Sequence, residues 1–144
     1  ANGLTTILLA KCTSEKNVQI YTIDLSPSKT AYKALNSSNV NIIQSDSSCF
    51  AKKWEVEHKQ KIDFLLIDGD HSFLGIYKDF YSWIPHLNPG AVLAIHDYDP
   101  PERGGIAHLG VWIFIKTLIE NLVLKDVLHL HRFCSLNGIS LMLL

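Results

Sequence analysis

The chain has 144 residues, of which 47% are hydrophobic and 19% are charged, so it carries enough apolar material for a folded core. Neither disorder nor a small fold held by disulfides is needed to explain such a composition. Its 13 basic and 14 acidic residues include no basic block, which argues against a nucleic-acid or anionic-membrane binder. We therefore expect a small-molecule ligand, no nucleic acid and no membrane partner.

The sequence also bears on location. The most apolar long stretch, residues 109–124, contains Lys116 and Glu120, so it fails as a run of about twenty membrane-spanning residues. No basic segment followed by an apolar one opens the chain, so no signal peptide is expected. The cysteines form no CxxC pair and lie among apolar or small residues, which predicts buried, reduced thiols in a cytoplasmic protein. They are Cys12, Cys49 and Cys134.

Apolar runs alternate with helical patterns along the first half of the chain, which predicts an α/β fold. The apolar run "IDFLLID" is nearly continuous, as in a parallel strand buried on both faces, and we expect it to be the central strand. Pro27 suits the first turn of a helix. The predicted order is helix 4–12, strand 18–26, helix 27–37, strand 40–46, short helix 51–60 and strand 62–68.

The second half continues this alternation. Apolar residues at helical spacing run from Ile76 to Leu87, and the helix is expected to stop at residues 88–90, where Pro and Gly end helices. A strand over 91–97 follows, and then a helix whose apolar stripe runs from Val111 to Leu122. Residues 127–133 and 139–144 are predicted to close the sheet as an antiparallel pair joined through Asn137 and Gly138.

These elements predict one doubly wound, mostly parallel, Rossmann-like sheet with a C-terminal antiparallel hairpin, in a single domain spanning 1–144. Such a sheet normally begins with a strand, whereas Ala1 to Gly3 lead directly into a helix. We therefore expect an N-terminal truncation, with the first strand and part of a glycine-rich loop lying upstream. A gap or an unseen strand is then expected between strands 18–24 and 62–68.

Polar residues follow the predicted strands at the edge where open α/β sheets bind ligands. Any one aspartate there is also typical of a turn or a helix N-cap, and the sequence leaves that alternative open for each. Four consecutive strand ends of this kind favour a binding site. The residues are Gly3 before the first helix, then Asp24, Asp46 with Ser47, Asp68 to His71, and His96 with Asp97.

Chemistry suggests a role for each of these groups. Asp24 suits a carboxylate that accepts hydrogen bonds from ribose hydroxyls, and Asp46 with Ser47 suits either an adenine contact or a local turn. Asp68 and Asp97 offer hard oxygen donors on neighbouring strands, and His96 adds a nitrogen donor, so a divalent cation is expected there. His71 lies three residues after Asp68, and because imidazole is the side chain suited to accept a proton at neutral pH, it is a candidate base.

The stretch "LLIDGDHSFLGIYKDFYSWIPHLNPGAVLAIHDY", residues 65–98, resembles the class I S-adenosylmethionine-dependent methyltransferases. The resemblance is to the small O-methyltransferase-like group related to the catechol and macrolide-sugar O-methyltransferases. "ANGLTTILLA" resembles the end of the cofactor glycine loop, and "YTIDLSP" resembles the acidic ribose-binding strand. The most specific part is the block from DGDH to HD.

The resemblance implies S-adenosylmethionine (SAM) as cofactor, bound by Gly3, Asp24, Asp46, Ser47 and Asp68. It further implies a divalent cation held at Asp68, His96 and Asp97, with His71 as the base. Metal-dependent relatives carry a carboxylate at the position of His96, so this sequence departs from them there, and Mg²⁺, a softer metal or no metal remain open.

The implied reaction is transfer of a methyl group from SAM to a hydroxyl oxygen of a small molecule. The acceptor stays unspecified, and a homo-oligomer stays open. Two alternatives remain. One is a non-catalytic cofactor-binding scaffold. The other is a haloacid-dehalogenase-type phosphatase, in which Asp68 would be the nucleophile and Asp70 the acid/base.

Overall fold

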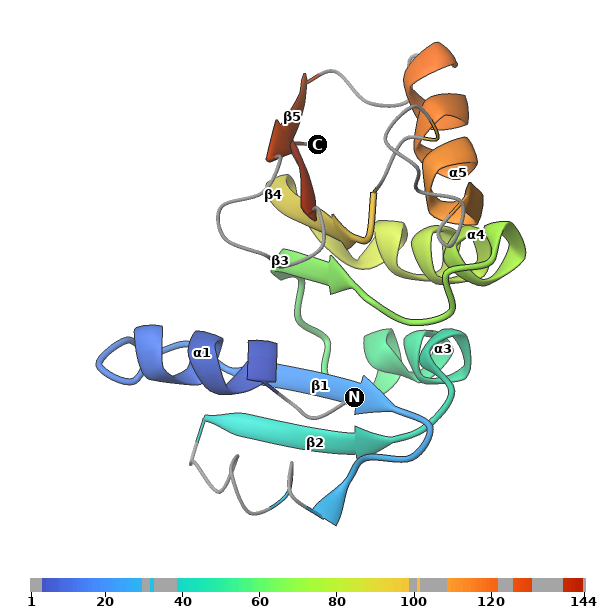
Figure 1. The fold of residues 1–144 in the computed structure, drawn as a ribbon. Helices are drawn as coiled ribbons and strands as arrows, with labels where there is room; N and C mark the ends of the chain where they lie inside the picture. The colour runs from blue at the N-terminus through green and yellow to red at the C-terminus, as the bar shows by residue number, and fades with distance from the viewer. Residues whose placement is uncertain are drawn as a thin grey trace. The chain divides into compact units, whose positions relative to one another are not determined.

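The structure is a computed structural model that describes residues 4–29, 32, 39–98, 101, 109–121, 126–130 and 139–143. Figure 1 shows the course of the chain, which divides into two compact units, residues 1–50 and 51–144. Of the helix predicted over 27–37, the structure describes four residues: Pro27 and Ser28 are not helical, whereas Lys29 and Tyr32 are. Gly3, Cys134 and the predicted Asn137–Gly138 turn lie outside the described residues.

In the first unit, the structure confirms the predicted helix over 4–12 and shows that the two predicted strands pair in parallel. Ile20 pairs with Val40 at the start of the strands, and Asp24 pairs with Gln44 at their end. The hydroxyl of Thr6 donates to that of Thr22 at 3.3 Å, so helix and strand are also linked by side chains. The elements are α1 (Leu4–Cys12), β1 (Ile20–Asp24) and β2 (Val40–Gln44).

Helix α3 (Ser47–Glu57) begins four residues earlier than the predicted range of 51–60 and ends three residues sooner. The early start has a local cause. Oδ1 of Asp46 accepts hydrogen bonds from the backbone N–H of Cys49 and from the hydroxyl of Ser48, each at 2.8 Å. Asp46 is therefore the N-cap of this helix, one of the alternatives that the sequence left open.

The second unit holds a four-stranded sheet in the order β3-β4-β6-β5. The first two strands are parallel, and the last two run antiparallel, which confirms the predicted closing pair. In the described residues β1 pairs only with β2, and β3 pairs only with β4. The strands are β3 (Ile62–Ile67), β4 (Leu87–His96), β5 (Asp126–Leu130) and β6 (Ile139–Leu143).

Helix α4 (Phe73–Trp83) ends earlier than the sequence predicted. A short 3₁₀ turn, η1 (Ile84–His86), follows it, and β4 begins at Leu87 rather than at Ala91. Pro85 explains the difference, because its nitrogen carries no hydrogen and cannot donate the backbone hydrogen bond that would continue the α-helix. Leu87 therefore belongs to the sheet, and the helical spacing that included it was a wrong prediction at that position.

Helix α5 (Leu109–Glu120) confirms the predicted apolar stripe, because its buried residues are Val111, Phe114, Ile115 and Leu118. Lys116 and Glu120 form an ion pair at 3.6 Å on its exposed side. None of the helices in the described ranges has the length and apolar character that a membrane span requires.

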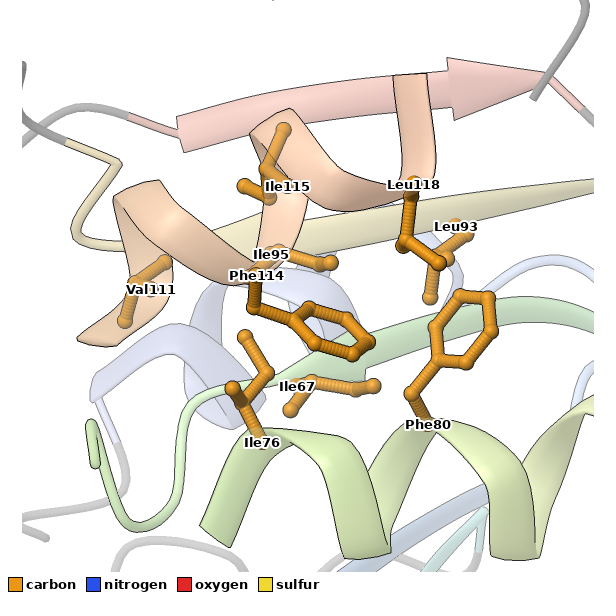
Figure 2. Close-up of a cluster of buried hydrophobic side chains, with 9 residues drawn as sticks. All are labelled: Ile67, Ile76, Phe80, Leu93, Ile95, Val111, Phe114, Ile115 and Leu118. Carbon is orange, nitrogen blue, oxygen red and sulfur yellow. The ribbon is translucent and has the colours of Figure 1, made fainter. Parts of the chain in front are cut away.

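The hydrophobic core of the second unit lies between its sheet and the helices α4 and α5 (Figure 2). Ile67 comes from β3, and Leu93 and Ile95 come from one face of β4, where alternate side chains point the same way. The rings of Phe80 and Phe114 pack edge to face, with centroids 5.3 Å apart. The remaining members of the core are Ile76, Val111, Ile115 and Leu118.

The predicted burial of the cysteine thiols was wrong for the two cysteines that the structure describes. Cys12 and Cys49 are free, and both are exposed. Each lies in a terminal turn of a helix, Cys12 in the last turn of α1 and Cys49 in the first turn of α3. Apolar neighbours in sequence did not indicate burial, because residues adjacent on a helix point in different directions.

Neighbouring aromatic residues of α4 provide a test of this core. Phe80 is 1% exposed, whereas Tyr81 is 48% exposed. Phe80→Ala should lower the free energy of unfolding by about 3–5 kcal/mol, because it removes a buried ring and leaves a cavity. Tyr81→Ala should cost about 1 kcal/mol or less. Urea unfolding checks both, and equal losses would contradict this core.

Candidate active site

Strands β3 and β4 bring the first two polar side chains of the site together. Their parallel register pairs Ile67 with Ile95, so the residues that follow, Asp68 and His96, lie side by side at the carboxyl ends of the strands. Nδ1 of His96 is 3.1 Å from Oδ1 of Asp68. This proximity was predicted from the sequence, because the ends of adjacent parallel strands meet at one edge of a sheet.

Asp97 is the buried member of the site. Its carboxylate is 3% exposed, and its backbone has φ of 59°, in the left-handed region that few residues other than glycine adopt. Oδ1 lies 3.0 Å from Nδ1 of His96, and Oδ2 lies 3.3 Å from Nδ1 of His71. One buried carboxylate therefore contacts both imidazoles of the site.

His71 lies in the loop between β3 and α4, and its two ring nitrogens face different carboxylates. Nδ1 faces Asp97, and Nε2 is 3.5 Å from Oδ1 of Asp68. A carboxylate beside Nδ1 favours the tautomer that carries its proton there. The lone pair of Nε2 is then directed towards the side of the site formed by Asp68, where it can accept a proton.

The arrangement of donor atoms fits a metal ion. Asp68, His71 and His96 each offer one ligand atom, and these atoms lie within 4.8 Å of one another. Nδ1 of His96 is buried and makes no hydrogen bond within the described ranges, although two carboxylate oxygens lie within 3.1 Å of it. Metal–ligand bonds of about 2.1 Å place neighbouring donors about 3.0–3.5 Å apart, which matches these separations.

The loop that carries His71 is fixed by local hydrogen bonds. Oδ1 of Asp70 accepts from the backbone N–H of Ser72, and Oδ2 accepts from its hydroxyl, each at 2.9 Å. The Ser72 hydroxyl in turn accepts from the backbone N–H of Gly75 at 3.0 Å and so caps α4. The backbone hydrogen bond from Ser72 lowers the pKa of Asp70 below its ordinary value.

Asp70 thus has a structural role, because both oxygens of its carboxylate bind Ser72. This arrangement gives no support to the phosphatase alternative, which needs Asp70 as an acid/base. The loop also depends on Gly75, where a Cβ atom would lie 2.5 Å from Oδ2 of Asp70.

Gly110 is a residue of this site region that the sequence interpretation missed. A Cβ atom at this position of α5 would lie against the backbone nitrogen of Phe73 and 2.5 Å from the carbonyl oxygen of His71. Only glycine lets α5 come this close to the His71 loop. A glycine inside a helical pattern is a weak signal of such a contact and could have marked the position.

The predicted cofactor residues of the first unit have local partners. Oδ1 of Asp24 accepts from the backbone N–H of Ser26 at 2.7 Å, and this bond is the main cause of its lowered pKa. The hydroxyl of Ser48 is the first cause of the lowered pKa of Asp46, and Ser47 is the first residue of α3. Both carboxylates are therefore ionised at neutral pH. Their contacts with a cofactor remain predictions, as does that of Gly3.

Comparison with known proteins identifies the family. The sequence pattern of a family described as a methyltransferase domain matches residues 1–98. The chain belongs to this methyltransferase domain family. A curated relative, the uncharacterised protein y4gI of Sinorhizobium fredii, is 39% identical over 51 residues, which are 35% of this chain and 5% of that protein. The chain thus spans a small part of that relative.

Solved structures share the fold of this methyltransferase domain. An O-methyltransferase from Bacillus cereus in complex with SAH matches with a TM-score of 0.77 at 18% identity, covering 99% of this chain and 69% of that one. TomG from Streptomyces achromogenes, an O-methyltransferase solved with SAM, matches at 0.68 and 18% identity over 99% and 68%. MycE, from mycinamycin biosynthesis and solved with Mg and SAH, matches at 0.54 and 20% over 86% and 36%. The likeness confirms the predicted α/β fold.

A substitution at Gly110 of the methyltransferase domain tests the close approach of α5 to the His71 loop, because the approach predicts a loss of stability where helix propensity alone predicts a gain. Gly110 is the second residue of α5, and alanine has a higher helix propensity than glycine. Gly110→Ala should instead lower the free energy of unfolding, because the added methyl group meets the backbone of the His71 loop. Thr117→Ala, on the exposed side of the same helix, should change stability by about 0.5 kcal/mol or less. Urea unfolding measures both, and a more stable Gly110→Ala protein would contradict the close approach.

Proposed function

We propose that this chain is a SAM-dependent methyltransferase that transfers a methyl group to a hydroxyl oxygen of a small molecule, with His71 as the general base. The observation that carries the proposal is the contact of Asp97 with Nδ1 of His71, which leaves Nε2 facing the site beside Asp68. Membership of the methyltransferase domain family supports the reaction class. The SAH or SAM in similar solved O-methyltransferases supports the cofactor.

In the proposed reaction, the acceptor hydroxyl gives its proton to Nε2 of His71. The acceptor oxygen attacks the methyl carbon of the sulfonium, so that a C–O bond forms as the S–C bond breaks and SAH leaves. Asp97 faces Nδ1 of the same ring, where it holds the tautomer and stabilises the imidazolium that forms. Because Asp97 is buried, water screens this interaction little.

We also propose a divalent cation that Asp68, His96 and Asp97 would hold, and of these Asp68 and His96 belong to the cluster of possible ligand atoms described above. When bound, such a cation lowers the pKa of an acceptor hydroxyl and stabilises negative charge on its oxygen. A similar solved structure, MycE, contains Mg. Without a cation, the negative charges of Asp68 and Asp97 would disfavour an alkoxide on the acceptor. The cation would offset these charges, while the proposed base removes the proton of the acceptor hydroxyl.

For the cofactor we propose the residues at the ends of the other strands. Asp24 is suited to the ribose hydroxyls, Asp46 and Ser47 to the adenine, and Gly3 and Asp68 to the methionine end. The acceptor is proposed to be a small molecule, and a cytoplasmic location is proposed because Cys12 and Cys49 are free thiols. A scaffold that binds SAM without turnover is the remaining alternative, and the two variants below distinguish it.

Asp24→Ala tests the cofactor site without any knowledge of the acceptor. Loss of a charged acceptor of ribose hydrogen bonds should weaken SAM binding about 10- to 100-fold. Asp63→Ala, which removes an exposed carboxylate bonded to Asn88 at 2.7 Å, should leave SAM affinity unchanged. Isothermal titration calorimetry measures both, with circular dichroism to verify folding. Unchanged affinity in Asp24→Ala would make Asp24 a turn residue only.

His71→Gln tests the base. SAM affinity should stay within about twofold of the parent, whereas the rate of methyl transfer should fall about a hundredfold or more, the usual scale for losing a general base. Raising the pH should restore part of the rate, because the ionised acceptor needs no base. The assay follows SAH formation with a panel of phenols, catechols and sugars.

The matched control is His86→Gln, which removes a histidine from the end of η1 and should keep the parent rate. A parent rate in His71→Gln would assign His71 a structural role. Binding of SAM with no transfer to any acceptor in the panel, by the parent protein itself, would favour the scaffold.

A further inference from the structure

The site combines carboxylates with imidazoles, and this set of donor atoms determines which cations it can bind well. We infer that the site selects a late first-row divalent metal, of the class Fe²⁺, Co²⁺, Ni²⁺ and Zn²⁺, over Mg²⁺, and that Nδ1 of His96 is the ligand that decides this. The inference deepens the proposed function, because it names the metal of the same site. It does not require that methyl transfer occurs.

The first argument comes from the chemistry of the donors. Mg²⁺ is a hard cation that prefers six oxygen ligands and retains water, and imidazole nitrogen is a poor replacement for one of those oxygens. Fe²⁺, Co²⁺, Ni²⁺ and Zn²⁺ bind imidazole well and accept carboxylates beside it. At the end of β4, the residue next to Asp97 is His96, so nitrogen stands where a further oxygen donor would suit Mg²⁺.

The second argument comes from the position of Nδ1 of His96. This atom is buried, and it lies 3.1 Å from Asp68 and 3.0 Å from Asp97, yet it makes no hydrogen bond in the described part of the chain. An N–H group has one direction in the ring plane and can serve only one of these two oxygens well. A cation among the ligand atoms of Asp68, His71 and His96, which lie within 4.8 Å of one another, would instead receive a lone pair from the imidazole of His96.

The third argument concerns the second imidazole. One ligand atom of His71 lies within 4.8 Å of those of Asp68 and His96, so a second nitrogen is near the same point. Asp97 faces the other ring nitrogen of His71 at 3.3 Å, and carboxylates in this position orient histidines at metal sites. If His71 ligates the cation, its nitrogen further disfavours Mg²⁺; if it acts as the base, the preference rests on His96.

The inference is tested by metal binding to the full chain after treatment with a chelator. Co²⁺ is the probe, because the position and intensity of its visible d–d absorption depend on its ligands and on their geometry. Co²⁺ should bind in one-to-one ratio, Zn²⁺ should displace it, and Mg²⁺ in about a hundredfold excess should not. His96→Asp should weaken Co²⁺ binding about tenfold or more, change its spectrum, and leave Mg²⁺ binding equal or tighter.

His86→Asp is the matched control, since it makes the same substitution outside the site and should leave Co²⁺ binding unchanged. If His96→Asp does not fold, as judged by circular dichroism, His96→Asn serves in its place, with the same expected loss of Co²⁺ affinity. The inference is overturned if the parent binds Mg²⁺ as tightly as Co²⁺, if it binds neither ion, or if the folded His96 variant keeps the parent Co²⁺ affinity and spectrum.

These outcomes separate this inference from the proposed function. A protein that prefers Co²⁺ but transfers no methyl group would overturn the proposed function and leave the metal preference standing. A protein that transfers methyl groups with Mg²⁺ and binds it as tightly as Co²⁺ would do the reverse.

Discussion

The parallel register of β3 and β4 is the constraint on which the site depends. Ile67 pairs with Ile95, and the same pairing places Asp68 beside His96 one residue later. A slip of one residue would turn every side chain of the strand to the opposite face of the sheet. The register is fixed because Ile67, Leu93 and Ile95 must all face the core beneath α4 and α5. The apolar core therefore determines which polar atoms meet at the strand ends.

Helices α4 and α5 extend this dependence to the loop that carries His71. The loop is joined to α4 by the hydrogen bonds of Ser72, and it is approached by α5 at Gly110. Both helices are held against the sheet by buried residues such as Phe80 and Phe114. Core packing, the Ser72 cap and the contact with α5 thus all restrict the position of the His71 imidazole. A solvent-exposed loop alone would leave this side chain mobile.

The sequence predicted those features that depend on periodicity and on chain order. The parallel pairs, the stripe of α5 and the meeting of Asp68 with His96 follow from apolar patterns and from the rule that parallel strands end at one edge. Element boundaries were less predictable, because a single local hydrogen bond or ring decides them. The cap at Asp46 moved the start of α3, and Pro85 ended α4 early.

The rest of the site required the structure. The capping role of Asp70 and the clearance at Gly110 depend on which backbone atoms come together in three dimensions. Nothing in the residue types alone shows that the carboxylate of Asp97 reaches both imidazoles, since His71 and Asp97 are far apart in the chain. Residue identity indicated the chemistry, whereas tertiary contacts determine which atom faces which.

The left-handed backbone of Asp97 explains how two successive residues serve one site. In an extended strand, neighbours point to opposite faces, so His96 and Asp97 would be separated by the sheet. The φ of 59° at Asp97 breaks that alternation, and the two side chains lie 3.0 Å apart. Position 97 therefore meets two separate demands. The backbone admits glycine, asparagine or aspartate at low cost, the contact with two imidazoles calls for a carboxylate, and aspartate is the residue that meets both demands.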